Sequence, residues 1–199
     1  MTIDFNSAER QQDFGLIPAK TIVPLVMNIR PGGSGGDGWY TASKNSDAMM
    51  LDVEFTVSEG PYAKRKIWQY FVMSGGKLSS NGDSIAGNIS RTTLRAILES
   101  ARNIKPEDAS EAAVNARRIN SLEDFNGMCF LAKIGIEKDK NGQFEDKNKI
   151  LAVITPDMKE YSEGYTKEGP EVVAGMPNLQ TPPPPPAMHT ACPTPEWAV

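Results

Sequence analysis

Short segments in which hydrophobic and polar residues alternate recur along the chain, and this two-residue period predicts β-strands. The clearest is residues 49–57, MMLDVEFTV. One face of this strand is apolar and the other is polar: Leu51, Val53, Phe55 and Val57 against Asp52, Glu54 and Thr56. A strand with this pattern buries one face against a core and exposes the other to water.

The other segments predicted as strands are residues 20–30, 62–73, 128–137 and 149–154. In the first of them Pro24 favours an edge position or a bulge, because proline cannot donate a hydrogen bond to a ladder. Residues 58–61, SEGP, are typical of a turn and make a hairpin of the second and third strands. The pair Asn141-Gly142 is a turn signal between the last two strands.

Between the third and fourth predicted strands, hydrophobic residues recur at the three- and four-residue intervals of a helix instead of every second residue. The residues that recur at helical intervals in the first predicted helix are Ile89, Thr93, Leu94, Ile97, Leu98 and Ala101. Residues 88–90 offer an N-cap for this helix. A second helix is predicted over residues 106–118, because Pro106 suits a first helical turn and the acids at 107 and 108 suit the helix dipole.

The predicted order of elements is β-β-β-α(α)-β-β, which indicates a mainly β, α+β domain. Three strands, a helical connection and a final hairpin is the order of the five-stranded oligonucleotide/oligosaccharide-binding (OB) barrel. The helices here would be an insertion between its third and fourth strands. In such barrels the second and third strands and their flanking loops bind single strands. Other α+β sandwiches share this order, so the OB-like barrel is a hypothesis.

With 199 residues the chain has room for one domain and an appendage. We place the domain at residues 14–161, after an N-terminal arm at residues 1–13. Residues 162–199 are predicted to be a disordered tail with polyproline II character, because nine of the fifteen prolines lie in the last 39 residues and large apolar side chains are few there. Near its end, Trp197 is either a peptide anchor for a partner's pocket or part of an unconstrained terminus.

Several classes of protein are excluded by what the sequence lacks. His189 is the only histidine and lies in the predicted tail, which excludes a folded histidine base and a two-histidine metal site. Residues 33–38 match GxGxxG but lead into another strand instead of opening a helix, which argues against a nucleotide cofactor. We therefore expect no cofactor and no metal. Apolar runs are short and the first residues do not resemble a signal peptide, so we expect a cytoplasmic location and no membrane.

Charge is unevenly distributed in this chain of formal net charge -4. Residues 64–105 carry eight Lys or Arg against two Asp or Glu, whereas the rest of the chain is acidic. Such a block is typical of a surface that binds a polyanion. The alternative is that the same cations are scattered over a solvated surface.

The third strand carries the most informative pattern. Its two-residue period puts Lys64, Lys66, Trp68 and Tyr70 on one face and Arg65, Ile67, Gln69 and Phe71 on the other. The first face would combine ammonium groups for phosphates with aromatic rings for unstacked bases. In the alternative, the two aromatic residues belong to the core and the lysines mark the exposed entry of the strand.

Two other segments add candidate binding residues. In the loop after the first strand, Trp39 either stacks on bases or folds back onto the core. Three arginines near one side of the first predicted helix, Arg91, Arg95 and Arg102, either extend the phosphate track or form the solvated side of the helix. The predicted nucleic-acid-binding residues are Trp39, Tyr40, Lys44, Lys64, Arg65, Lys66, Trp68, Tyr70, Arg91 and Arg95.

Carboxylate chemistry needs no histidine, so a nuclease is a second hypothesis. Asp52 and Glu54 share the polar face of one strand, and Lys64 or Lys66 lies across the hairpin. This loosely resembles a site in which two carboxylates and a lysine hold Mg²⁺. The same arrangement is also that of ordinary cross-strand ion pairs.

A dispersed set of short segments carries a resemblance to a known family: residues 59–62 (EGPY), 65–68 (RKIW), 88–90 (NIS), 125–127 (FNG) and 148–150 (NKI). Over roughly residues 14–161 the sequence resembles a family of tailed-phage and prophage proteins, long catalogued as a domain of unknown function and described as phage single-stranded DNA-binding proteins. The resemblance implies an OB-like domain without enzymatic activity. Such a domain would coat intermediates of DNA replication or recombination in a bacterial host cell.

We therefore expect a non-catalytic, sequence-tolerant protein whose partner is single-stranded DNA. Two alternatives stay open: a protein-interaction or recombination accessory module that works through its tail, and a Mg²⁺-dependent nuclease that uses Asp52 and Glu54. Replication or recombination proteins are candidate partners of the tail. Assembly into a homo-oligomer also stays open, because linked binding sites multiply affinity.

Overall fold

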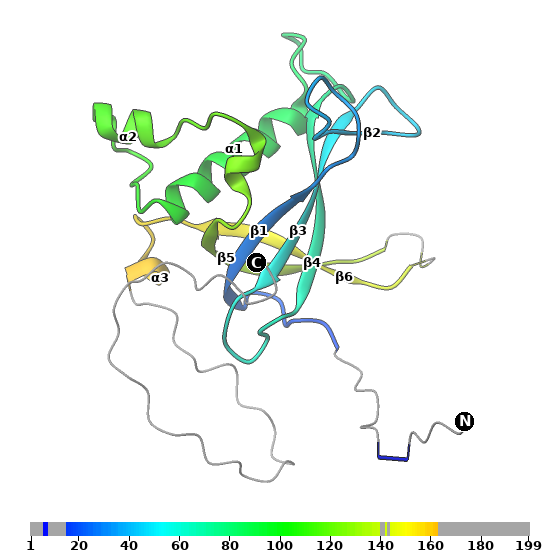
Figure 1. Cartoon of the computed structure of the whole chain (residues 1–199), viewed down its shortest axis with the longest axis vertical. Coiled ribbons are helices and arrows are strands. Elements are labelled where there is room, and N and C mark those ends of the chain that lie inside the picture. Colours follow the sequence, from blue (N-terminus) through cyan, green and yellow to red (C-terminus); the bar gives the residue numbers. More distant parts are fainter. Residues whose placement is uncertain (1–5, 8–14, 140–141, 143, 163–199) are drawn as a thin grey trace.

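The computed structural model describes residues 6–7, 15–139, 142 and 144–162. Within them the fold is mainly β, of the α+β class, with one antiparallel six-stranded sheet and one long helix, α1 (Ile85–Ala101), after strand β4 (Lys66–Ser74) (Figure 1). The predicted class and order of elements are confirmed. The predicted arm and the predicted proline-rich tail lie outside the described residues, apart from residues 6, 7 and 162.

The sheet has the strand order β2-β3-β1-β5-β6, and β4 pairs with β3. Its strands are β1 Ile22–Arg30, β2 Thr41–Ala42, β3 Met49–Val57, β4 Lys66–Ser74, β5 Cys129–Glu137 and β6 Lys147–Ile154. The shorter helical elements are α2 Glu111–Ala116, the 3-10 helix η1 Leu122–Phe125 and α3 Lys159–Ser162. Five strands match predicted ones, and the two-residue strand β2 is an addition that no pattern indicated.

Pro24 lies in an inner strand, so the expectation of an edge position was wrong. Strand β1 is paired with β3 on one side and with β5 on the other. The ladder with β3 begins only at Leu25, opposite Val57. Pro24 therefore lies just beyond the end of that ladder, where its carbonyl accepts the Ser58 N–H at 3.0 Å. The missing N–H of the proline costs the sheet no ladder hydrogen bond at this position.

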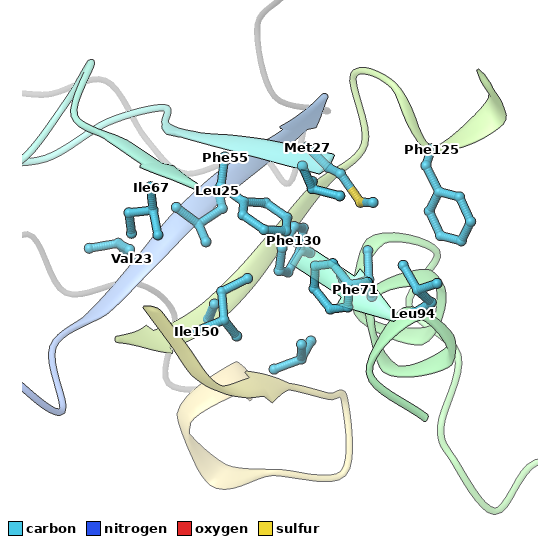
Figure 2. Close-up of a cluster of buried hydrophobic side chains, with 14 of the residues drawn as sticks. Val23, Leu25, Met27, Phe55, Ile67, Phe71, Leu94, Phe125, Phe130 and Ile150 are labelled. Carbon is cyan, nitrogen blue, oxygen red and sulfur yellow. The ribbon is translucent and has the colours of Figure 1, made fainter. Parts of the chain in front are cut away.

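The core lies between the inner face of the sheet and α1. The alternation predicted for β3 is confirmed, because its odd-numbered side chains from 51 to 57 are all buried. Phe55 makes edge-to-face contacts with Phe71, at 6.1 Å between ring centroids, and with Phe130, at 5.7 Å. Figure 2 shows these rings in one cluster with Leu94 of α1. Strands from both halves of the chain are thus joined through one aromatic side chain.

Helix α1 begins one turn earlier than predicted. Its N-cap is Ser84, whose hydroxyl accepts the Gly87 N–H at 3.1 Å and donates to the Gly75 carbonyl at 2.6 Å. Asn88, the predicted cap, is inside the first turn and accepts a hydrogen bond from Arg91. A β-carbon at Gly87 would lie 3.0 Å from the Met73 carbonyl oxygen, so the glycine allows the helix to approach the end of β4 closely.

Helix α2 begins later than predicted. Ser110 caps it by accepting the Ala113 N–H at 3.2 Å, so the first helical residue is Glu111. Pro106 and its neighbours lie instead in a turn closed by the Asp108 N–H and the Lys105 carbonyl at 3.0 Å. The residues from Pro106 to Asp108 suit a first helical turn, but only Ser110 is seen to accept a hydrogen bond from a free N–H, and the helix begins after it.

Strands β4 and β6 lie close to each other, but within the described residues no ladder joins them. The link between them is a side chain: Gln69 Oε1 accepts the Ile150 N–H at 3.1 Å. Beyond β6, the Tyr161 hydroxyl donates to the Ser100 carbonyl at 2.9 Å and fastens α3 to the end of α1.

A buried carboxylate joins α1 to the segment that follows it. The side chain of Glu99 is only 4% exposed, and its Oε1 accepts hydrogen bonds from Arg95 at 2.8 Å and from Arg117 at 2.7 Å. Arg117 also donates to the carbonyls of residues 105, 106 and 108. One ion network therefore fixes the turn and α2 against the long helix.

We predict that Glu99→Ala destabilises the fold by about 3 kcal/mol, because it leaves the half-buried Arg117 without its carboxylate. Urea unfolding followed by circular dichroism measures the change. Glu160→Ala is the matched control, since it also removes one carboxylate, but from an exposed pair with Lys133 that contributes little to stability. Equal unfolding free energies for the two variants would contradict the role assigned to Glu99.

Candidate nucleic-acid interface

Two aromatic side chains of β4 are exposed on the side of the sheet opposite the core. Trp68 is 49% exposed and Tyr70 is 56% exposed, whereas Ile67 and Phe71, which alternate with them, are 2% exposed. The prediction that Trp68 and Tyr70 share a face with Lys66 is confirmed. The alternative, in which the two aromatic residues belong to the core, was wrong.

Pairing across three strands arranges polar residues around these rings. Glu54 of β3 lies opposite Trp68 of β4 and opposite Asn28 of β1, and Asp52 lies opposite Tyr70 and Arg30 in the next row. We call this surface the outer face, and it consists of Asn28, Arg30, Asp52, Glu54, Lys66, Trp68 and Tyr70. Side chains in such directly opposed positions are close enough to interact.

Glu54 holds two of its neighbours in place. Its Oε1 accepts a hydrogen bond from Lys66 Nζ at 2.6 Å, and its Oε2 accepts one from the Trp68 indole N–H at 3.0 Å. Burial by itself would raise the pKa of Glu54, but the hydrogen bonds from Lys66 and Trp68, with the charges of Lys66 and Arg30, outweigh it and lower the pKa. The carboxylate is therefore ionised at neutral pH and fixes the orientation of the indole ring.

Asp52 forms the second ion pair of the outer face. Both of its carboxylate oxygens lie 2.7 Å from Arg30 Nη2. The hydrogen bond to Asp52 raises the pKa of Arg30 above its ordinary value. Arg30 was not among the predicted binding residues, because only the register of β1 against β3 places it beside Asp52. The signal in the sequence was its position at the end of a predicted strand, which does not by itself identify its neighbours.

The outer face is electrically balanced, with two cations and two carboxylates in close pairs. The Lys66–Glu54 pair is the kind of cross-strand ion pair considered as the alternative to a Mg²⁺ site, and it is confirmed, whereas the Arg30–Asp52 pair was not predicted. Among the described residues, no group of three or more His, Cys, Asp or Glu could hold a metal ion. None of the described helices is long and apolar enough to cross a membrane.

Several residues of the basic block lie on different parts of the fold, which favours the alternative of scattered cations. Lys64 is not on the strand face, because its positive φ of 66° places it in the turn before β4. The Arg65 guanidinium donates to the Gly15 carbonyl. Arg91 donates to the Met73 carbonyl at the far end of β4, and Arg95 belongs to the Glu99 network. Lys66 is joined to the exposed aromatic pair through Glu54, which accepts from both Lys66 and Trp68.

The aromatic residues of the loop after β1 pack partly against the core. Trp39 and Tyr40 are half-buried there, so the alternative that Trp39 folds back is supported. Gly35 has a φ of +82°, and a β-carbon on it would lie 2.6 Å from the Tyr40 ring. The glycine-rich loop opens no helix, as predicted, and leads into the short strand β2, which was not predicted. Lys44 is exposed farther along the same connection.

Because the pKa of Glu54 is lowered in the folded protein, its ionised carboxylate stabilises the fold, and this stabilisation is lost in acid. The unfolded chain binds this proton near the ordinary value of 4.5 and the folded chain at lower pH. The stabilisation is therefore complete above the ordinary pKa and disappears as the pH falls through the folded pKa. In urea unfolding, we expect the wild-type protein to be more stable than Glu54→Gln at about pH 7 and this advantage to shrink below about pH 4.5. An advantage of the same size at both ends of the range would contradict this account.

Comparison of the chain with protein-family models and with curated proteins found no match.

Proposed function

We propose that this protein is a non-catalytic, sequence-tolerant single-stranded DNA-binding protein that acts in phage or prophage DNA replication or recombination. The observation that carries the proposal is the pair of exposed rings, Trp68 and Tyr70, on a strand whose other face is buried. Large aromatic side chains that are exposed side by side on a sheet do not stabilise the fold by burial. Stacking of unpaired bases on the rings is a functional reason for such exposure.

The spacing of the two rings suits a splayed single strand. Residues two apart on a strand are separated by about 7 Å, which leaves room for one base on each ring. Each base–aromatic stack contributes on the order of 1 to 3 kcal/mol and tolerates any base, because every base has a π-face. The hydrogen bond from Trp68 to Glu54 fixes one ring before binding, which reduces the entropy lost on association.

The finer fold is also part of this proposal: the sheet closes into an OB-like barrel in which β1, β3, β4, β5 and β6 are the five strands. The long helix after β4 and the Gln69 link between β4 and β6 support this arrangement. In such a barrel the second and third strands, here β3 and β4, form the binding surface for single strands. Trp68 and Tyr70 lie on that surface.

Cations near the rings would contact the phosphates. Lys66 and Arg30 flank the aromatic pair on the outer face, and Arg91 of α1 donates to the Met73 carbonyl near the other end of β4. Each phosphate neutralised on a single strand contributes about -0.7 to the slope of log affinity against log salt. Contacts of this kind predict affinity that falls with salt.

Fluorescence anisotropy with a labelled oligothymidine, at low and at high salt, tests the proposal. We expect wild-type binding that weakens with salt, and a loss of affinity on the order of tenfold for each of Trp68→Ala and Tyr70→Ala, from the lost stack. Ile89→Ala is the matched control: its side chain is 64% exposed on α1, the helix that packs against the buried face of β4, and it should bind as the wild type does.

Wild-type protein that does not bind the oligonucleotide, or that binds equally well without either ring, would overturn the proposal. The same samples are then incubated with Mg²⁺. We expect the labelled strand to stay intact, and a strand that is cut by the wild type and not by Asp52→Ala would establish the nuclease instead.

A further inference from the structure

We propose that Asp52 and Glu54 are specificity-determining residues that reject duplex DNA from the outer face. This inference rests on the proposed function and concerns the same surface. A protein that must select single strands in the presence of duplex needs an element that penalises the wrong ligand, as well as one that attracts the right ligand. The two carboxylates have the position and the charge for that role.

Their position is beside the rings. Asp52 is directly opposite Tyr70, and Glu54 is directly opposite Trp68, so each aromatic side chain has a carboxylate as its neighbour on β3. Whatever contacts the rings therefore approaches two carboxylates, each paired with a cation of the outer face. A single strand can turn its bases toward the face and its phosphates away. A duplex has its bases stacked inside and presents mainly its charged backbone.

Their contacts show how the carboxylates would weaken binding of a duplex, by neutralising the two cations of this face. The carboxylate side chains are 18% and 14% exposed, for Asp52 and Glu54, whereas their partners Arg30 and Lys66 are 45% and 40% exposed. The carboxylates thus lie deeper than the cations and are fixed by short contacts of 2.7 and 2.6 Å. Each cation is already neutralised by a carboxylate, and that carboxylate is held in place by strand β3. The face therefore attracts a phosphate backbone less than two unpaired cations would, and base stacking is its main favourable contact.

The packing of the sheet prevents these charges from turning away. β3 is the strand between β1 and β4, and its alternate residues Val53 and Phe55 are fully buried. Asp52 and Glu54 must consequently point to the outer face as long as the core is intact. The charge on this surface is thus set by the same register that forms the core.

The test compares single-stranded and duplex affinity of the full chain in the same buffer, with labelled oligothymidine and a labelled duplex. The variant is Asp52→Asn/Glu54→Gln, which keeps the side-chain shapes and retains amide oxygens that accept from Arg30, Lys66 and Trp68. We expect its duplex affinity to rise about tenfold and its single-strand affinity less than about threefold, and we expect the difference to shrink at high salt.

Two further variants make the result specific to these positions. Glu160→Gln also removes one carboxylate from a lysine pair, on α3, and should leave both affinities within about twofold of wild type. Asp52→Asn alone leaves the Glu54 contact with Trp68 unchanged and should raise duplex affinity about threefold. It tests the inference even if the double variant does not fold.

The outcomes separate this inference from the proposed function. Equal gains for duplex and single strands, or no gain for duplex, would overturn the inference while single-strand binding by the wild type still stands. A wild-type protein that binds neither ligand would overturn both. A wild-type protein that already prefers duplex would overturn the inference directly.

Discussion

In β3 every second side chain points into the core, and the pairing of this strand with β1 and β4 carries that alternation across three strands. Phe55 enters the aromatic cluster from the same strand that presents Glu54 to the opposite side. A slip of one residue would exchange the two faces, burying the carboxylates and exposing the core. The burial of the apolar side chains therefore fixes the register, and the register fixes which residues surround Trp68 and Tyr70.

The outer face owes its character to contacts that are weak individually. Exposed ion pairs contribute about 0 to 1 kcal/mol to stability, so Arg30–Asp52 and Lys66–Glu54 are not what holds the fold together. Their consequence is geometric and electrostatic, because they fix the indole ring and cancel the charge around it. Affinity for a single strand would then come mainly from stacking, and a smaller part, which depends on salt, from cations such as Lys66 and Arg30.

Features that follow from the local alternation of hydrophobic and polar residues could be predicted from the sequence. Features that depend on which strands pair, and in which register, could not. Alternation located β3 and the aromatic face of β4 correctly. The role of Arg30 was missed, since its partner Asp52 is 22 residues away and only the sheet brings them together. Lys64 was placed on the wrong surface because a left-handed turn residue interrupts the period. The start of α1 was predicted one turn late, because Asn88 and Ser84 both have side chains that can cap a helix.

The central claim is that bases stack on Trp68, and tryptophan fluorescence measures this directly. Titration with unlabelled oligothymidine should quench part of the emission of the wild-type protein, because a base in contact with the indole ring alters its excited state. Trp68→Phe should lose this quenching while keeping most of the affinity, and Trp197→Phe, far along the sequence from β4, should keep both. Quenching of the same size in Trp68→Phe and in the wild type would contradict the account.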